Sequence, residues 1–135
     1  MSVLDASVVL KWFVSEQGSE DAVILRHEFV EGDRNIVVPD LLLYECANAL
    51  KYHPDFTVSE VQQSIDSLFS LGIDIVTPTA SLLKKATEIS FSADVTVYDA
   101  LYLALADEIK DRFITADEKF YQAVTERFPN IIFLL

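Results

Sequence analysis

Five short apolar segments, separated by longer stretches with helical character, constrain the fold of this chain more than any other feature. Each segment is rich in Val, Ile, Leu or Phe and is too short to form a helix of its own. Short apolar strands that alternate with helices are typical of a parallel sheet with helices on both faces. The expected strands are residues 2–5, 35–38, 73–76, 113–115 and 131–134.

The stretches between these strands carry the signals of helix starts and stops. Thr57-Val-Ser-Glu60 matches a capping box, and Gly72 is a suitable stop for the helix that follows it. Asp40 stands at an N-cap position. The expected helices are residues 6–14, 19–31, 41–52, 57–71, 81–89, 96–109 and 117–125. We therefore predict an α/β fold with three α/β/α layers and a five-stranded parallel sheet, formed by residues 1–135 as a single domain.

Three carboxylates stand alone in apolar sequence and give the clearest sign of a functional site. They are Asp5 within residues 1–10, Glu45 within residues 41–50 and Asp99 within residues 95–106. Each is the only charged residue of its stretch, so no nearby Lys, Arg or His compensates it. An ionised carboxylate beside a hydrophobic core is costly without compensation. A divalent cation would compensate all three.

The expected fold brings these carboxylates to one edge of the sheet, where ligands bind beyond the carboxyl ends of the strands. Asp5 ends the first strand, and Glu45 lies about one and a half turns into the helix after the second strand. Asp99 lies in the first turn of its helix. Asp117 follows the apolar residues 113–116 and is a fourth candidate. The pattern indicates a metal-dependent hydrolase.

Each candidate also has a purely structural interpretation. Asp5 could cap the helix after it, and both Asp99 and Asp117 lie in capping-box patterns. Glu45 has no such role because it stands in mid-helix. The convergence of all four at one edge favours a shared metal site.

Other acidic or reactive side chains are assigned structural roles. Asp74 lies inside an expected strand, where a charge protects a sheet edge, and Asp94 lies in a polar loop. His27 and His53 are too far apart in sequence for a zinc motif, and Cys46 is expected in the core. The aromatic residues Trp12, Tyr98, Tyr102, Phe120 and Tyr121 are interpreted as core or interface.

Composition bears on partners and location. Apolar residues make up 51% of the chain and the mean hydropathy is +0.28, so we expect an oligomer or a bound partner protein. The net charge of −12 argues against a broad basic surface for nucleic acid, which leaves a local basic patch or the metal ions. The nearby cations are Lys11, Lys51 and Lys119. Without a signal peptide or a long apolar run, the expected location is cytoplasmic, with no membrane partner.

Four segments surround the same carboxylates and follow one another at regular spacing. They are DASVVLKWF (5–13), PDLLLYECANAL (39–50), YDALYLALA (98–106) and ITADEKF (114–120). In this order they resemble the successive motifs of PIN domains, and among these they are most similar to the VapC-like toxin ribonucleases of prokaryotic toxin–antitoxin pairs. The resemblance covers essentially the whole chain.

The resemblance implies a ribonuclease that depends on Mg²⁺ or Mn²⁺ and acts as the toxin of a type II toxin–antitoxin pair. It also implies an RNA substrate, a cognate antitoxin protein as partner, and a homodimer or higher homo-oligomer. By motif position the metal-binding and catalytic quartet is Asp5, Glu45, Asp99 and Asp117, and Ser7, Asn48 and Thr115 match supporting positions.

Two alternatives stay open at this point, and a third is disfavoured. The chain could be a housekeeping RNA-processing nuclease of the same fold, or a non-catalytic module of that fold that binds a protein. A phosphoacceptor receiver-like domain is disfavoured, because the first strand carries Asp5 alone and the third ends in Val76-Thr77-Pro78.

Overall fold

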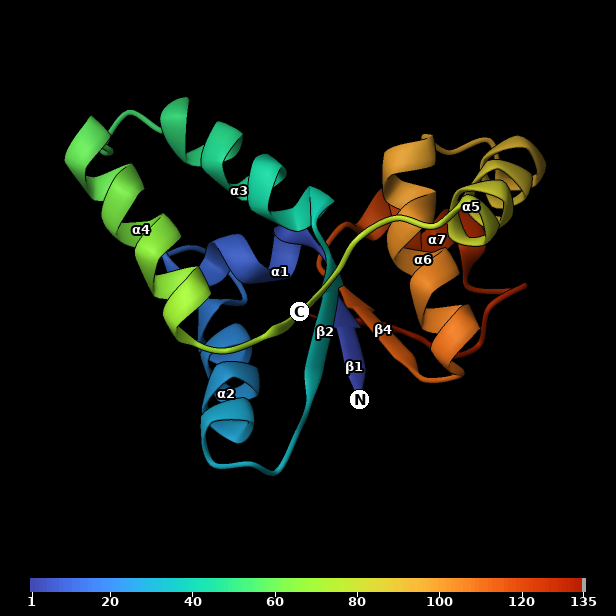
Figure 1. The fold of residues 1–135 in the computed structure, drawn as a ribbon, viewed down its shortest axis with the longest axis horizontal. Coiled ribbons are helices and arrows are strands. Elements are labelled where there is room, and N and C mark those ends of the chain that lie inside the picture. The colour runs from blue at the N-terminus through green and yellow to red at the C-terminus, as the bar shows by residue number, and fades with distance from the viewer. Residues whose placement is uncertain (135) are drawn as a thin grey trace.

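A parallel sheet between two groups of helices is seen in the computed structural model, which describes residues 1–134 (Figure 1). The strands are β1 (Ser2–Leu4), β2 (Ile36–Pro39), β3 (Asp74–Val76), β4 (Arg112–Thr115) and β5 (Ile131–Phe133). Their order is β3-β2-β1-β4-β5, and each neighbouring pair is parallel. The predicted α/β fold with a five-stranded parallel sheet is confirmed.

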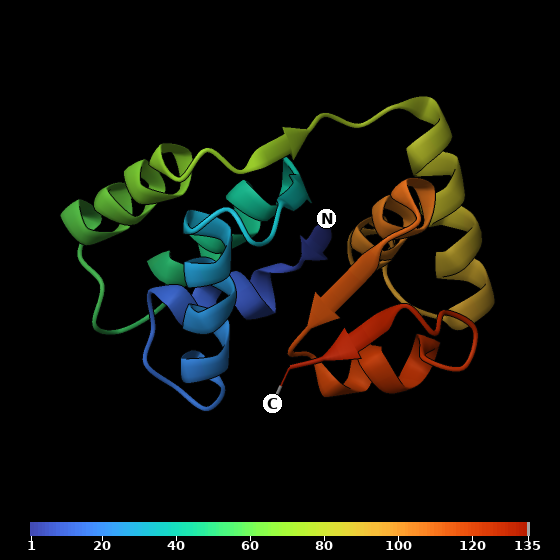
Figure 2. The same cartoon turned by 90° about the horizontal axis from the view of Figure 1, so that it is seen from below.

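Helices cover both faces of this sheet. Figure 1 shows α1 to α4 on the left and α5 to α7 on the right, and the view from below in Figure 2 shows the same division. The first group is α1 (Ala6–Val9), the 3-10 helix η1 (Leu10–Trp12), α2 (Ser19–Val30), α3 (Leu41–Lys51) and α4 (Val58–Ser70). The second group is α5 (Ala80–Ala93), α6 (Val97–Ile109) and α7 (Glu118–Val124).

Helix α6 is the centre of the second group. Residues 100–106 are all buried, because α6 packs on the central strands with one side and on α5 with the other. This burial explains why the segment is apolar all round rather than amphipathic. Among residues 1–134, no single helix is long and apolar enough to cross a membrane; α5 and α6 pass that test only as a pair, which is bent by 118° at the break between them.

Several element ends differ from the sequence prediction for identifiable reasons. The helix expected at residues 6–14 is divided into α1 and η1, and the indole nitrogen of Trp12 donates to the backbone oxygen of Ala22 at 2.7 Å, which ties η1 to α2. Helix α5 runs beyond residue 89 to Ala93 and ends where Asp94 adopts a left-handed conformation (φ +54°). The capping box of Thr57 forms as predicted.

Asp74 begins β3 rather than lying inside it, and its side chain is exposed. Because β3 is an outer strand of the sheet, Asp74 does lie at a sheet edge, as its charge suggested.

Candidate active site

All five strands are parallel, so their carboxyl ends lie at one edge of the sheet, and candidate residues follow three of them. β1 leads into α1, β2 into α3 and β4 into α7. Two residues connect the end of α6 to the start of β4. Helix α6 is therefore antiparallel to the strands, and its N-terminus lies at this same edge. The edge includes the boundary between β1 and β4, where the chain winds outward in opposite directions. In open parallel sheets this boundary is the usual ligand site.

Asp5 is the most buried of the four predicted carboxylates. It is 9% exposed and follows β1 as the N-cap of α1. The hydroxyl groups of Ser7 and Thr115 donate to its two carboxylate oxygens, and the backbone N–H of Val8 donates to Oδ1 at 3.3 Å. Burial raises the pKa of Asp5 to about 6 against these hydrogen bonds, and the neighbouring Asp117 raises the pKa further. Asp5 therefore caps a helix and also brings a carboxylate to the shared edge.

Ser7 and Thr115 join the turn after β1 to the turn after β4. The backbone N–H of Ala116 donates to Ser7 Oγ at 2.8 Å, and that of Asp117 donates to Thr115 Oγ1 at 3.1 Å. Both hydroxyls thus accept from backbone N–H groups of the turn after β4, and both donate to Asp5, which follows β1. These are contacts of the kind expected of residues that support a site; their effect on activity stays a prediction.

Glu45 lies half-buried in the second turn of α3. The hydroxyl of Tyr102, which belongs to α6, donates to Glu45 Oε1. Burial raises the pKa of Glu45, the Tyr102 hydrogen bond lowers it, and the nearby charge of Asp99 raises it. The sequence predicts Tyr102 as a core or interface residue; the structure buries Tyr102 and also places its hydroxyl on a candidate carboxylate. The signal in the sequence was its position three residues after Asp99, on the same face of the helix.

Asp99 and Asp117 line one cavity of about 200 Å³ together with Asp94 and Lys119. Burial and the charge of Asp117 raise the pKa of Asp99. Asp117 is exposed and caps α7, because its Oδ1 accepts from the backbone N–H of Phe120 at 3.1 Å. Asp94, which the sequence places in a polar loop, is exposed and also lines this cavity.

The three candidate phosphate contacts differ in their surroundings. Lys11 is bound to Glu16 at 3.1 Å and to the backbone oxygen of Gln17 at 2.6 Å. Lys51 lies over the ring of Tyr52, with 4.7 Å between Nζ and the ring centroid. Lys119 alone of the three lines the cavity with two of the quartet carboxylates.

Asn48 is exposed on α3, one turn after Glu45, and its side chain makes no hydrogen bond within residues 1–134. No hydrogen bond within residues 1–134 supports the predicted role of Asn48, which stays a prediction.

Of the four carboxylates, Asp99 and Asp117 line the same cavity. Within the described part of the chain, no three His, Cys, Asp or Glu side chains are arranged so that they could hold a metal ion. The charge of Asp117 raises the pKa of Asp5 and of Asp99, and the charge of Asp99 raises the pKa of Glu45. A set of carboxylate oxygens fits a hard dication such as Mg²⁺, which proteins commonly bind through one or two carboxylates while it keeps several waters.

Comparison with known proteins identifies the family. A profile for the PIN domain matches residues 2–125, and the chain belongs to the PIN domain family. It is 31% identical over 134 residues to Ribonuclease VapC3 from Pyrobaculum aerophilum, and the match covers 96% of each protein.

Solved structures with the same fold include a toxin and a chain of a toxin–antitoxin complex. A chain of a toxin–antitoxin complex from Klebsiella pneumoniae has a TM-score of 0.73 at 13% identity, covering 100% of this chain and 98% of that one. VapC20 from Mycobacterium tuberculosis, described as a sarcin–ricin loop cleaving toxin, has a TM-score of 0.71 at 15% identity, covering 91% of this chain and 95% of that one. The likeness to these structures shows the fold, and the predicted resemblance to VapC-like PIN domains is confirmed.

Proposed function

We propose that this protein is a metal-dependent ribonuclease that hydrolyses RNA phosphodiester bonds. The observation that supports this most directly is the buried Asp5 carboxylate at an edge that three more acidic side chains share. Burial disfavours the ionised form of a carboxyl group unless a cation binds beside it. The name of the relative VapC3 and the description of VapC20 support RNA as the substrate.

The four carboxylates would hold Mg²⁺ or Mn²⁺. Asp5 and Asp99 are the proposed primary ligands, and Asp117 holds a second cation or acts through water. When bound, a cation of this kind lowers the pKa of a coordinated water and stabilises the charge that develops on the phosphate.

Glu45 is the proposed group that binds the cation or orients the attacking water. Its Oε1 accepts from Tyr102, so Oε2 is the oxygen left to accept a hydrogen bond from water. A carboxylate with a raised pKa is better suited to take up a proton at neutral pH than one with the ordinary value.

The substrate has to approach a protein with a net charge of −12. Lys119 supplies a local positive charge in the wall of the cavity that Asp99 and Asp117 line. We propose that Lys119 contacts a phosphate of the RNA, so that a local contact and the cations replace a broad basic surface.

Cleavage of a defined RNA pool by the purified protein, with mapping of the new ends, tests this function. Cleavage should require Mn²⁺ or Mg²⁺ and should be lost in Asp5→Asn and Asp99→Asn. Asp74→Asn is the matched control, because Asp74 is an equally isolated acid that lies on the outer strand β3. Undiminished cleavage by Asp99→Asn would reject the proposed site. If the wild type does not cleave and binds no Mn²⁺, the alternative of a non-catalytic binding module is favoured.

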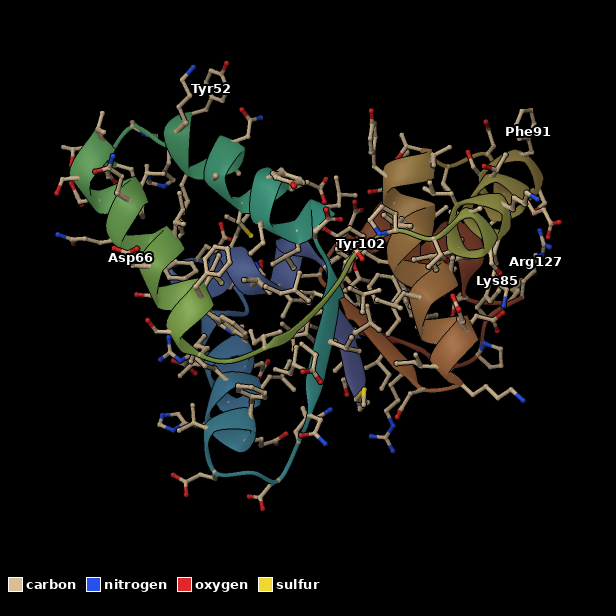
Figure 3. All side chains as sticks on the ribbon, in the orientation of Figure 1. Tyr52, Asp66, Lys85, Phe91, Tyr102 and Arg127 are labelled. Atoms are coloured by element: carbon tan, nitrogen blue, oxygen red, sulfur yellow. The ribbon has the colours of Figure 1, made fainter. Side chains whose placement is uncertain are left out.

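We further propose that the chain is the toxin of a toxin–antitoxin pair. The structural relatives include toxin–antitoxin complexes. Large apolar side chains on the surface fit a protein partner, among them Phe91 (85% exposed), Val58 (76%) and Tyr52 (72%). Tyr52 and Phe91 point outward at opposite ends of the molecule in Figure 3. A cognate antitoxin, a homodimer or higher homo-oligomer, and a cytoplasmic location are the corresponding proposals.

Induced expression tests the toxin role. Wild-type protein should arrest growth of the host, Asp99→Asn should not, and co-expression of an antitoxin encoded by a short reading frame next to the gene should restore growth. Normal growth with active wild-type enzyme would favour the housekeeping RNA-processing alternative.

A further inference from the structure

The hydroxyl group of Tyr102 is a buried polar group that the proposed reaction does not yet use. Tyr102 is 2% exposed, and its hydroxyl donates to Glu45 Oε1. A phenylalanine would fill the same volume in the core without a polar atom to satisfy. The hydroxyl therefore requires an explanation beyond packing.

The ring that carries this hydroxyl is held by the core. It stacks on Phe113 of β4 with the ring centroids 6.2 Å apart and the planes within 5° of parallel. Helix α6 is buried on every side along this stretch. Because neither the helix nor the ring has room to move, the position of the hydroxyl is fixed by packing rather than by Glu45.

Glu45 has no comparable support of its own. It is half-buried on α3, and a glutamate side chain turns about several bonds, so its carboxylate needs a partner to take one orientation. Tyr102 belongs to α6, the helix that carries Asp99, and its hydroxyl contacts Glu45 of α3 (Figure 3). A hydrogen bond from a neutral hydroxyl to a carboxylate is charge-assisted and short, which makes it an effective restraint.

Tyr102 is also placed to set the spacing of two carboxylates. It follows Asp99 by three residues on α6, so one rigid helix presents both the Asp99 carboxylate and the hydroxyl that holds Glu45.

We propose that Tyr102 is a positioning residue: its hydroxyl fixes the carboxylate of Glu45 with Oε1 engaged and Oε2 free, at a set distance from Asp99. This proposal rests on the proposed function, because it assigns Glu45 a role toward the cation or the attacking water. Groups that orient a metal ligand through a hydrogen bond commonly change metal affinity or activity by about 10- to 100-fold when they are removed.

Tyr102→Phe tests the proposal, with Mn²⁺ titrated into the protein by calorimetry in the absence of RNA and with kcat and KM for RNA measured separately. We expect Mn²⁺ affinity or kcat to fall about 10-fold or more while KM for RNA stays near its wild-type value. Tyr121→Phe is the control, since the Tyr121 hydroxyl makes no hydrogen bond within residues 1–134 and its ring packs on Phe133. It should match the wild type.

A double-mutant cycle separates positioning from stability. In a Glu45→Gln background, Tyr102→Phe should cause little further loss of Mn²⁺ affinity, because the group it positions is already altered. The same loss in both backgrounds, or wild-type Mn²⁺ affinity and kcat in a Tyr102→Phe protein that merely melts earlier, would overturn the proposal.

If Tyr102→Phe does not fold, Glu45→Asp takes its place. The shortened carboxylate no longer reaches the Tyr102 hydroxyl and should show the same loss of kcat, whereas wild-type values would overturn the proposal. A wild type that neither cleaves RNA nor binds Mn²⁺ would reject the proposed function itself, and this inference with it.

Discussion

The hydroxyl group of Thr115, which is fully buried at the end of β4, donates a hydrogen bond of 2.5 Å to Oδ2 of Asp5, a residue 110 positions earlier in the chain. The contact joins the carboxyl ends of the neighbouring strands β1 and β4, at the edge where the acidic side chains gather. It supplies a donor to a carboxylate for which the described residues provide no ion pair. The stability of the sheet and the protonation of the Asp5 carboxyl group are therefore linked.

Thr115→Val should destabilise the protein. Valine has nearly the same shape as threonine but leaves the buried Asp5 oxygen without its donor, which costs about 1–3 kcal/mol. Urea unfolding would measure this as a lower midpoint with an unchanged slope. Thr87→Val on the exposed face of α5 is the control and should change stability by less than about 0.5 kcal/mol. Equal stability of both variants would contradict the importance of the Thr115 contact.

Asp5 should make stability depend on pH in a defined window. Burial raises its pKa from 3.8 to about 6, so the folded protein binds this proton more tightly than the unfolded chain does. The free energy of unfolding should therefore fall as pH rises from about 4 to about 6, by up to about 3 kcal/mol from this group, and level off above.

Asp5→Asn removes the charge and keeps a good N-cap, so it should lack this part of the pH dependence. The comparison requires unfolding curves of both proteins across that range with EDTA present. The variant should gain stability relative to the wild type as pH rises through the window, while losing cleavage. A difference in stability that does not change with pH would show that Asp5 is not held with a raised pKa.

Divalent cations should stabilise the wild-type protein. A ligand that binds only the folded state raises the free energy of unfolding by about 2.7 kcal/mol at a concentration 100 times its Kd. Thermal melting with Mn²⁺ and with EDTA measures the effect. It should be retained in Asp74→Asn and lost in Asp99→Asn, and an equal Mn²⁺ effect in the latter would place the cation elsewhere.

Lys119→Gln should weaken RNA binding with little change in kcat. Loss of one phosphate contact lowers affinity for all sequences alike and reduces the slope of log K against log salt by about 1. KM or a binding titration at several salt concentrations gives that slope. Lys84→Gln, on an exposed part of α5, is the matched control and should leave the slope unchanged. A similar change in both variants would mean that only the overall charge of the protein matters.

The fold could be predicted from sequence because its signals are local. Short apolar strands, the capping box at Thr57 and the apolar run of α6 each depend on neighbours within a few residues. The errors are also local in origin. The helix expected at residues 6–14 is divided into α1 and η1, and the sequence does not show that Trp12 of η1 bonds to Ala22 of α2. It also does not show that α5 continues to Ala93.

The four carboxylates could be proposed from sequence because isolated charges in apolar sequence are costly and because strand ends converge at one edge. The structure places all four near that edge and shows that two of them, Asp5 and Asp117, also cap helices. The sequence offers capping and a role at the site as alternatives, whereas one carboxylate can accept from a backbone N–H and still present its charge.

By itself the sequence determined the strand and helix pattern and the acidic residues, since periodicity and lone charges are properties of neighbouring residues. Only the tertiary structure decided which groups contact those acids: Thr115 and Ser7 bind Asp5, and Tyr102 binds Glu45. It also placed Lys119 in the cavity that Asp99 lines. The physical reason is that hydrogen bonding, burial and charge coupling depend on distances in space, which the fold sets between residues far apart in the chain. The carboxyl groups of Asp5 and Glu45 can thus be recognised in the sequence, while their protonation and orientation are properties of the folded core.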